Sequence, residues 1–233
     1  MPKLPPNFRM IPIVLVFVTA AWGVFELSRI SIRTTGVDLD HRILQGLRST
    51  ADPERMIGPV WMEEAMRDFT ALGGYAVLIT STTAFAFFAR VELGRGPFRF
   101  FLLTVVGGFI SGIVLKELIQ RPRPTVVPHL SLVTGNTSFP SSHAMMSVVV
   151  FVTAGLLLSE LTRHRVLHHL LVGCPLGITM LVGVSRVCMG VHFPTDVLGG
   201  WFAGLAWVWL SFSIRLLLQR RSVLLTESDS RID

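Results

Sequence analysis

Six long apolar stretches constrain this chain more than any other feature of its sequence. A helix that crosses the hydrocarbon layer of a membrane needs about 20 mainly apolar residues, and its backbone polar groups must be satisfied within the helix. Open sheets are excluded there, so the stretches predict an all-α, polytopic membrane protein with six transmembrane helices. These are Met10–Leu27, Phe69–Ala89, Phe98–Leu118, Ala144–Leu161, Val166–Val187 and Pro194–Leu217.

The predicted spans divide the chain into three parts. Residues 1–68 hold the first span and the segment Ser28–Asp68, in which acidic and basic residues are interleaved. We predict that this segment is an amphipathic, partly helical excursion on the outer face. Residues 69–217 form the main membrane domain, and residues 218–233 form a cytoplasmic tail. A cleaved signal peptide is the alternative for Met10–Leu27, but its apolar run is longer than a typical signal core and no small-x-small site follows it.

Charge placement predicts the orientation in the membrane. The net charge of +6 is compatible with nucleic-acid binding, yet the basic residues lie mainly between and beyond the spans. Cytoplasmic loops are enriched in lysine and arginine, so a membrane explanation is simpler and no nucleic-acid partner is expected. We predict a multi-pass protein of the inner (plasma) membrane. Its cytoplasmic side carries Lys3, Arg9, Arg90, Arg95, Arg99, Arg163, Arg165, Arg215, Arg220 and Arg221.

Ionisable residues gather at the opposite ends of the spans, on the predicted outer face. Lys116 closes the third span, Arg123 follows it, and Arg186 closes the fifth span. Guanidinium groups suit bidentate contact with phosphate oxygens, and all three side chains are positively charged, so they can bind the same anion. The fourth helix begins near Ser141, and the free N–H groups at a helix start also bind phosphate. These features predict a site for a phosphate anion.

A histidine and an aspartate four residues apart add reactive chemistry to this anion site. His192 and Asp196 flank Pro194, which suits the first position of a helix. A carboxylate that accepts from one ring nitrogen leaves the other nitrogen able to attack phosphorus, as in a catalytic triad. His143, at the start of another helix, would then protonate the leaving oxygen.

The three clusters together resemble the type 2 phosphatidic acid phosphatase (PAP2) superfamily, which shares its site with vanadium haloperoxidases. The resemblance covers roughly Phe69–Leu217, and order and spacing agree throughout. The pattern Lys-x6-Arg-Pro falls on Lys116, Arg123 and Pro124; Pro-Ser-Gly-His falls on Pro140, Ser141, Ser142 and His143; Ser-Arg-x5-His-x3-Asp falls on Ser185, Arg186, His192 and Asp196.

The resemblance implies a six-helix bundle that hydrolyses a lipid phosphate or diphosphate without metal or other cofactor. It implies that His192 is the nucleophile, Asp196 orients it and His143 is the acid. The phosphate would be held by Lys116, Arg123, Ser141, Ser142 and Arg186. One departure is Ser142, where the family has glycine. Serine is strained there if the position needs a positive φ, and fits if only its N–H is used.

Plainer explanations exist for several of these residues. Lys116 and Arg123 would serve equally as headgroup anchors at helix ends, and the two serines as N-caps. Arg121 lies outside the family pattern, and we predict a headgroup contact or loop role for it.

Two other functional classes remain open. A lipid phosphotransferase on the same scaffold would use another alcohol in place of water, and a non-catalytic anion transporter would keep only the cations. The expected substrates are undecaprenyl diphosphate, phosphatidate or phosphatidylglycerol phosphate, and nothing in the sequence indicates an oligomeric state.

Overall fold

The computed structural model describes residues 19, 23–26, 28–29, 34–133 and 135–229. Throughout these residues the regular structure is helical, which confirms the predicted all-α class. The first predicted span, Met10–Leu27, lies mostly outside the described residues. The helices are α2 (Thr34–Gly46), α3 (Val60–Leu72), α4 (Tyr75–Phe88), η2 (Ala89–Leu93), α5 (Arg95–Ile119), α6 (Ser142–Ser147), η3 (Val148–Val152), α7 (Thr153–Ser159), α8 (Arg165–Cys188) and α9 (Pro194–Asp229).

Five helical stretches within the described residues are long and apolar enough to cross a membrane. They match the last five predicted spans: Tyr75–Leu93, Arg95–Ile119, Ser142–Ser159, Arg165–Cys188 and Pro194–Gln219. Two of them contain a wide helical turn of the π type, at η2 and η3. The predicted end of the last span at Leu217 is not a helix end, since α9 continues to Asp229.

The second predicted span begins too early. Phe69 belongs to α3, which ends at Leu72, and the helical structure is interrupted at Gly73 and Gly74 before α4 starts at Tyr75. Gly73 permits a close approach of α3 to α8, because an added Cβ would lie 2.5 Å from the Val182 side chain. The segment before it contains the two helices α2 and α3, in agreement with the partly helical excursion predicted for Ser28–Asp68.

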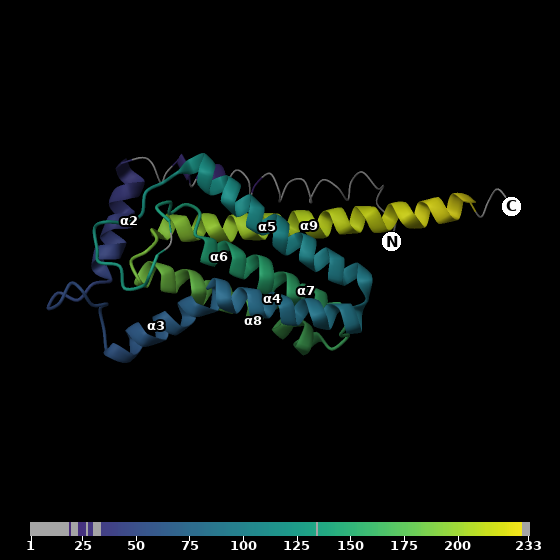
Figure 1. The fold of residues 1–233 in the computed structure, drawn as a ribbon, viewed down its shortest axis with the longest axis horizontal. Helices are drawn as coiled ribbons and strands as arrows, with labels where there is room; N and C mark the ends of the chain where they lie inside the picture. The colour runs from purple at the N-terminus through teal and green to yellow at the C-terminus, as the bar shows by residue number, and fades with distance from the viewer. Residues whose placement is uncertain (1–18, 20–22, 27, 30–33, 134, 230–233) are drawn as a thin grey trace.

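The central helix of the bundle is the continuous stretch α6–η3–α7 (Figure 1). It packs against α5, α8 and α9, and 67% of its most apolar window is buried, compared with 17% for α4 and for α5. Small residues allow this packing: a Cβ on Gly204 of α9 would lie 2.8 Å from the Met145 carbonyl oxygen. Apolar side chains on α4 and α5 face outward, as expected of helices that contact lipid.

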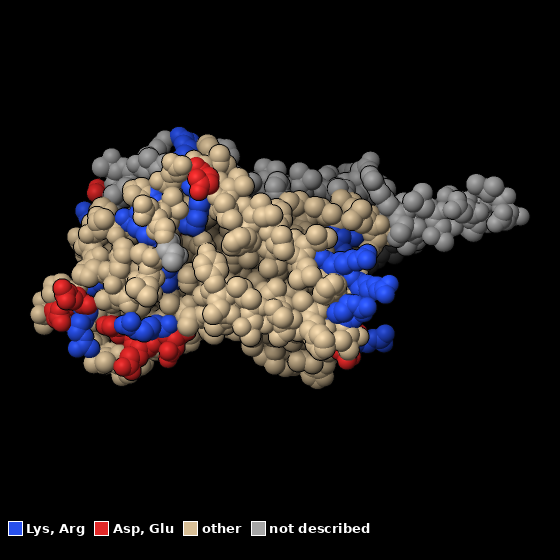
Figure 2. Space-filling view, in the orientation of Figure 1, with Lys and Arg blue, Asp and Glu red and all other residues tan. Residues whose placement is uncertain are grey.

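Charged side chains lie at the two ends of the bundle, separated by an uncharged band (Figure 2). One end has η2, the start of α5, and the turn from α7 to α8, and carries mainly arginine. The other end carries α2, α3 and the long loop from Gln120 to Ser141. At this second end, helices α5, α6, α8 and α9 all start or finish, which brings the predicted site residues together.

Candidate active site

A cavity of about 320 Å³ opens at the α2–α3 end of the bundle. Six of the eight predicted site residues line it, although they come from five separate segments of the chain. His143 and His192 open into this same cavity, so the structure brings together the two imidazoles that the sequence paired. The six are Lys116, Arg123, Ser142, His143, Arg186 and His192.

The three cations are held in place by protein oxygens. Lys116 donates to the Thr137 carbonyl at 3.1 Å, and Arg123 donates from Nε to the Gly135 carbonyl at 2.9 Å. Burial lowers the pKa of Arg123 and nearby Asp196 opposes the change, but a guanidinium starts from so high a value that it stays charged.

Arg186 is the most deeply placed of the three cations. It is only 3% exposed and donates from Nη1 to the Thr70 hydroxyl at 3.3 Å. Its Nε is buried with no hydrogen-bond partner among the described residues. An unsatisfied buried donor costs free energy, so a bound anion at this point of the cavity would remove that cost.

His192 is placed to present one nitrogen to the cavity. Its Nε2 lies 3.3 Å from Nη1 of Arg123, and because arginine only donates, Nε2 acts as an unprotonated acceptor. The ring proton is thereby assigned to Nδ1, which lies 3.5 Å from Oδ2 of Asp196. That distance exceeds the 2.7–3.2 Å of a well-formed hydrogen bond, and Nδ1 has no closer partner among the described residues.

The environment of His192 keeps its ring neutral. The side chain is 2% exposed, and this burial lowers its pKa to about 4. Asp196 raises the pKa, while Arg186 and Arg123 lower it further. At neutral pH the ring therefore carries a lone pair on Nε2, which is the form that a nucleophile needs.

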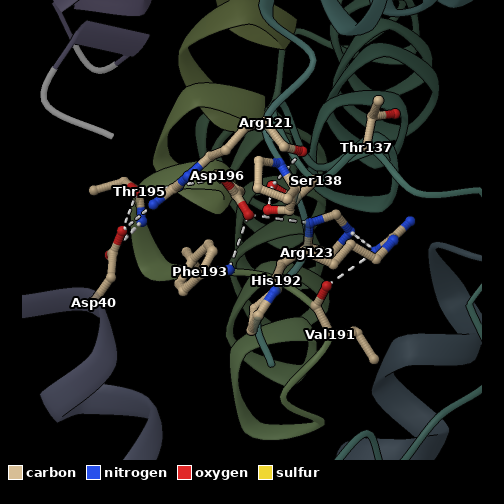
Figure 3. A network of polar contacts seen from close by, with 12 residues as sticks. Asp40, Arg121, Arg123, Thr137, Ser138, Val191, His192, Phe193, Thr195 and Asp196 are labelled. Atoms are coloured by element: carbon tan, nitrogen blue, oxygen red, sulfur yellow. Dashed lines mark hydrogen bonds and ion pairs between the residues drawn. The ribbon is translucent and has the colours of Figure 1, made fainter. Parts of the chain in front are cut away.

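Asp196 lies behind the cavity wall and is fully buried. Its Oδ2 also accepts the backbone N–H of Phe193 at 2.9 Å, which closes the turn that leads into α9. Its Oδ1 accepts from Nη1 of Arg121 at 2.5 Å. Both carboxylate oxygens are thus fixed, and the one nearer the imidazole is held by the turn that carries the histidine (Figure 3).

Arg121 corrects the sequence interpretation. It lies in the loop after α5, one of the two predicted alternatives, but it is not a headgroup contact: it is 5% exposed and pairs with two aspartates, Asp196 and Asp40, the latter at 2.8 Å. Its guanidinium also lies 4.0 Å from the ring centre of Phe193. Arg121 thus stands directly behind the His192–Asp196 pair (Figure 3).

The run Arg121-Pro122-Arg123-Pro124 explains this arrangement. A residue that precedes proline favours an extended backbone, and in an extended chain residues two apart share a face. Both arginines therefore point to the same side, where Arg121 contacts Asp196 and Arg123 contacts His192. The signal was present in the sequence, as two arginines at a spacing of two.

Asp40 was missed entirely. It lies on α2, is 1% exposed, and accepts from Arg121, from the Thr195 hydroxyl at 2.5 Å and from the Thr195 N–H at 3.2 Å. Nothing local marks it, because its partners lie 81 and 155 positions further along the chain.

The two serines before His143 differ in position. Ser142 lines the cavity at the first turn of α6, whereas Ser141 is fully buried and its N–H donates to the Asp196 carbonyl at 3.0 Å. Contrary to the prediction that it holds the phosphate, Ser141 does not line the cavity. It joins the start of α6 to the start of α9 instead. Among the described residues only Gln120 is a non-glycine with positive φ, so serine at position 142 is unstrained.

Comparison with known proteins gives consistent results. The family model described as PAP2 superfamily matches residues 97–220. Phosphatidylglycerophosphatase B of Bacillus subtilis (strain 168) is 33% identical over 162 residues, which cover 64% of this chain and 73% of that protein. An undecaprenyl-diphosphatase of Sulfolobus acidocaldarius is 35% identical over 116 residues, which cover 48% of each chain.

A solved structure extends the likeness to the fold. The crystal structure of a transmembrane PAP2 type phosphatidylglycerolphosphate phosphatase from Bacillus subtilis superposes with a TM-score of 0.75 at 27% sequence identity. The superposition covers 85% of this chain and 95% of that one.

Proposed function

This chain belongs to the PAP2 superfamily and is a multi-pass membrane phosphatase, and from that premise we propose that it hydrolyses a lipid phosphate or diphosphate through a phosphohistidine at His192. The observation that carries the proposal is the cavity itself. Two imidazoles and three cations surround a space of about 320 Å³, large enough for a phosphate group and part of a headgroup.

In the first step, the terminal phosphate sits among Lys116, Arg123 and Arg186. Nε2 of His192 attacks phosphorus as the bond to the leaving oxygen breaks, and His143 gives that oxygen a proton. The cations neutralise charge on the phosphoryl oxygens, which supplies most of the catalysis in phosphoryl transfer. Asp196 faces the Nδ1 proton and balances the positive charge that the ring acquires.

In the second step, water attacks the phosphohistidine. His143, now without its proton, takes one from the water, and the N–P bond breaks to release inorganic phosphate and neutral His192. Binding of a dianion beside His143 favours its protonated form before each cycle, so one residue serves both as acid and as base.

The walls of the cavity support a lipid as the substrate. Beyond the polar groups lie Tyr75, Phe109, Ile113 and Leu132, and these four side chains are at least 44% exposed. Phe109 and Ile113 belong to α5, a helix whose apolar side chains face outward, so an aliphatic chain in the bilayer would lie next to a phosphate in the cavity. Phosphatidylglycerophosphate, undecaprenyl diphosphate and phosphatidate all have this form.

The distribution of charge supports a site on the outer face. Arginines concentrate at the end of the bundle opposite the cavity, and the positive-inside rule makes that end cytoplasmic. A membrane-impermeant maleimide applied to intact cells should therefore label a cysteine placed at the exposed Thr50, in the turn after α2, and not one placed at the exposed Arg165.

The test is phosphate release by the purified protein from these three lipids in detergent, with His192→Ala as the blank. We expect activity above the blank in EDTA and inhibition by vanadate, which imitates the five-coordinate phosphorus. Rapid quench in alkaline detergent with a ³²P-labelled substrate should trap a phosphoenzyme that is stable in base and labile in acid. Release at the blank level from all three lipids would refute the proposal, as would a strict requirement for magnesium.

A further inference from the structure

Three buried charged side chains form a chain behind His192, and only the last of them belongs to the chemistry described above. Asp40 on α2 pairs with Arg121 at 2.8 Å, and Arg121 pairs with Asp196 at 2.5 Å. All three are at most 5% exposed. We propose, on the basis of the phosphatase mechanism above, that Asp40 and Arg121 are positioning residues that fix the Asp196 carboxylate and set the charge His192 experiences.

The geometry of Asp196 is the first support. Arg121 holds Oδ1, the oxygen remote from the imidazole, and the Phe193 N–H holds Oδ2, the oxygen that faces Nδ1. A carboxylate held at one oxygen only would be free to rotate about its Cβ–Cγ bond. With both oxygens held, Oδ2 stays directed at His192 throughout the reaction.

Asp40 gives Arg121 its own fixed position. Its Oδ2 accepts from Nη2 of Arg121 and from the Thr195 hydroxyl, and its Oδ1 accepts the Thr195 N–H. Thr195 stands at the start of α9, next to Asp196, where the helix dipole favours a negative charge. Asp40 therefore fixes both the arginine and the helix turn that carries Asp196 (Figure 3).

The balance of charge is the second support. Arg121 and Asp196 alone would form a neutral pair, and His192 would face a carboxylate whose field is cancelled. Asp40 adds a second negative charge that offsets Arg121, so the three residues together carry one net negative charge. That charge matches the positive charge on the imidazole while its Nε2 is bonded to phosphorus.

Other charged groups around His192 set the background for a test. Arg123 lies on the extended loop, Arg186 on α8, Lys116 on α5, His143 on α6 and Asp196 on α9, while Arg121 and Asp40 stand behind. Removal of Arg121 or of Asp40 changes the field at His192 with opposite signs. A merely structural ion pair would not distinguish the two.

The experiment compares Asp40→Asn, Arg121→Gln and the double variant. The measurement is the pH dependence of kcat/KM for a short-chain phosphatidate in detergent, whose acid limb reports the protonation of His192. Loss of the arginine's positive charge should move the midpoint up by about one pH unit, and loss of the aspartate's negative charge should move it down by about as much. The double variant restores the net charge, so its midpoint should return close to that of the wild type.

Both single variants should also lose about 10- to 100-fold in kcat, the loss typical of partners that orient an active group. Arg121→Lys should recover part of that loss and keep the wild-type limb. Removal of one partner of a buried ion pair destabilises a protein strongly, but a midpoint does not depend on how much enzyme is folded. In Asp40→Asn the buried guanidinium of Arg121 loses one of its two charged partners. The double variant does not have this problem, because the guanidinium itself is absent.

Arg48→Gln is the matched control. Arg48 is also a buried arginine at this end of the bundle, 6% exposed, but it binds the Cys188 and Pro128 carbonyl oxygens and does not contact Asp196. Its loss should lower stability without moving the acid limb.

Two failures are distinguishable. The first failure concerns the positioning role alone. It would be shown by an active wild type whose acid-limb midpoint equals those of Asp40→Asn and Arg121→Gln, or by two single variants whose midpoints shift in the same direction. A wild type that releases no more phosphate than His192→Ala would overturn the phosphatase mechanism, and the positioning role with it.

Discussion

Gly200 offers a direct test of whether helix packing sets the geometry of the site. It lies on α9 one turn after Asp196, where that helix crosses the start of α6. A Cβ at this position would lie 2.7 Å from the Ser141 carbonyl oxygen and 3.0 Å from Cβ of Ala144. The obstructing atom is part of the backbone and cannot rotate away, so in Gly200→Ala the two helices must separate.

The required movement follows from these distances. Ordinary contact begins at 3.4 Å, so the Ser141 carbonyl must retreat by about 0.7 Å. The same residue donates its N–H to the Asp196 carbonyl at 3.0 Å, and that bond would lengthen as well. His143 would then move relative to His192, and a misplacement near 1 Å can reduce a rate by about 100-fold.

We expect kcat/KM for Gly200→Ala to fall by about 10- to 100-fold, with a loss of about 1–3 kcal/mol in stability from overpacking. Gly177→Ala on α8 is the control, because nothing lies within 4 Å of a Cβ there and alanine favours a helix. Phosphate release and the thermal unfolding midpoint, measured on both variants, decide the matter. Equal activity in the two would refute the idea that close packing of α6 on α9 positions the histidines.

Four further outcomes follow from the site. Because burial lowers the pKa of His192 to about 4, wild-type kcat/KM should fall as the pH is lowered, with a midpoint near pH 4. A midpoint near 6.5 would contradict the buried environment of His192. The imidazole of His192 takes up a proton near pH 6.5 in the unfolded chain but only near pH 4 in the native state. The free energy of unfolding should therefore decrease by about 3 kcal/mol as the pH falls from 6.5 to 4. Acid-unfolding curves of His192→Gln should lack this decrease. Thr70→Val removes the acceptor of Arg186 and should lower kcat/KM about tenfold, while Thr70→Ser should not, as steady-state assays of both will show. Ser142→Gly keeps the backbone N–H at the start of α6 and should raise KM about tenfold at nearly constant kcat; a collapse of kcat would assign the hydroxyl a larger role.

Much of the architecture could be predicted from the sequence because a membrane permits so few solutions. Backbone groups in hydrocarbon must be satisfied locally, so apolar length alone located the spans that lie in the described residues. The boundary at Phe69 failed because the last turn of α3, from Phe69 to Leu72, joins α4 in one apolar stretch of sequence. Only the structure reveals that Gly73 and Gly74 end one helix and begin another.

The cavity residues were predictable for a different reason. Lys116, His143 and Arg186 each stand at a helix end, and His192 lies in the short turn between α8 and α9. Ionisable groups in such places are conspicuous beside apolar spans. Ser141 shows the limit of this reasoning. Its position before α6 was correct, but spacing could not tell that its N–H is used by Asp196 and that its side chain is enclosed.

Asp40 marks the point where sequence patterns give no guidance. Its role depends on α2 packing against the start of α9, a tertiary contact that no local pattern encodes. The family match begins at residue 97, so it includes Arg121 and Asp196 but omits the carboxylate that balances them. A buried guanidinium without its second partner is costly, and the matched region by itself would carry that cost. The N-terminal segment therefore completes the site electrostatically, because the balance of charge behind His192 requires a residue from each of three separated parts of the chain.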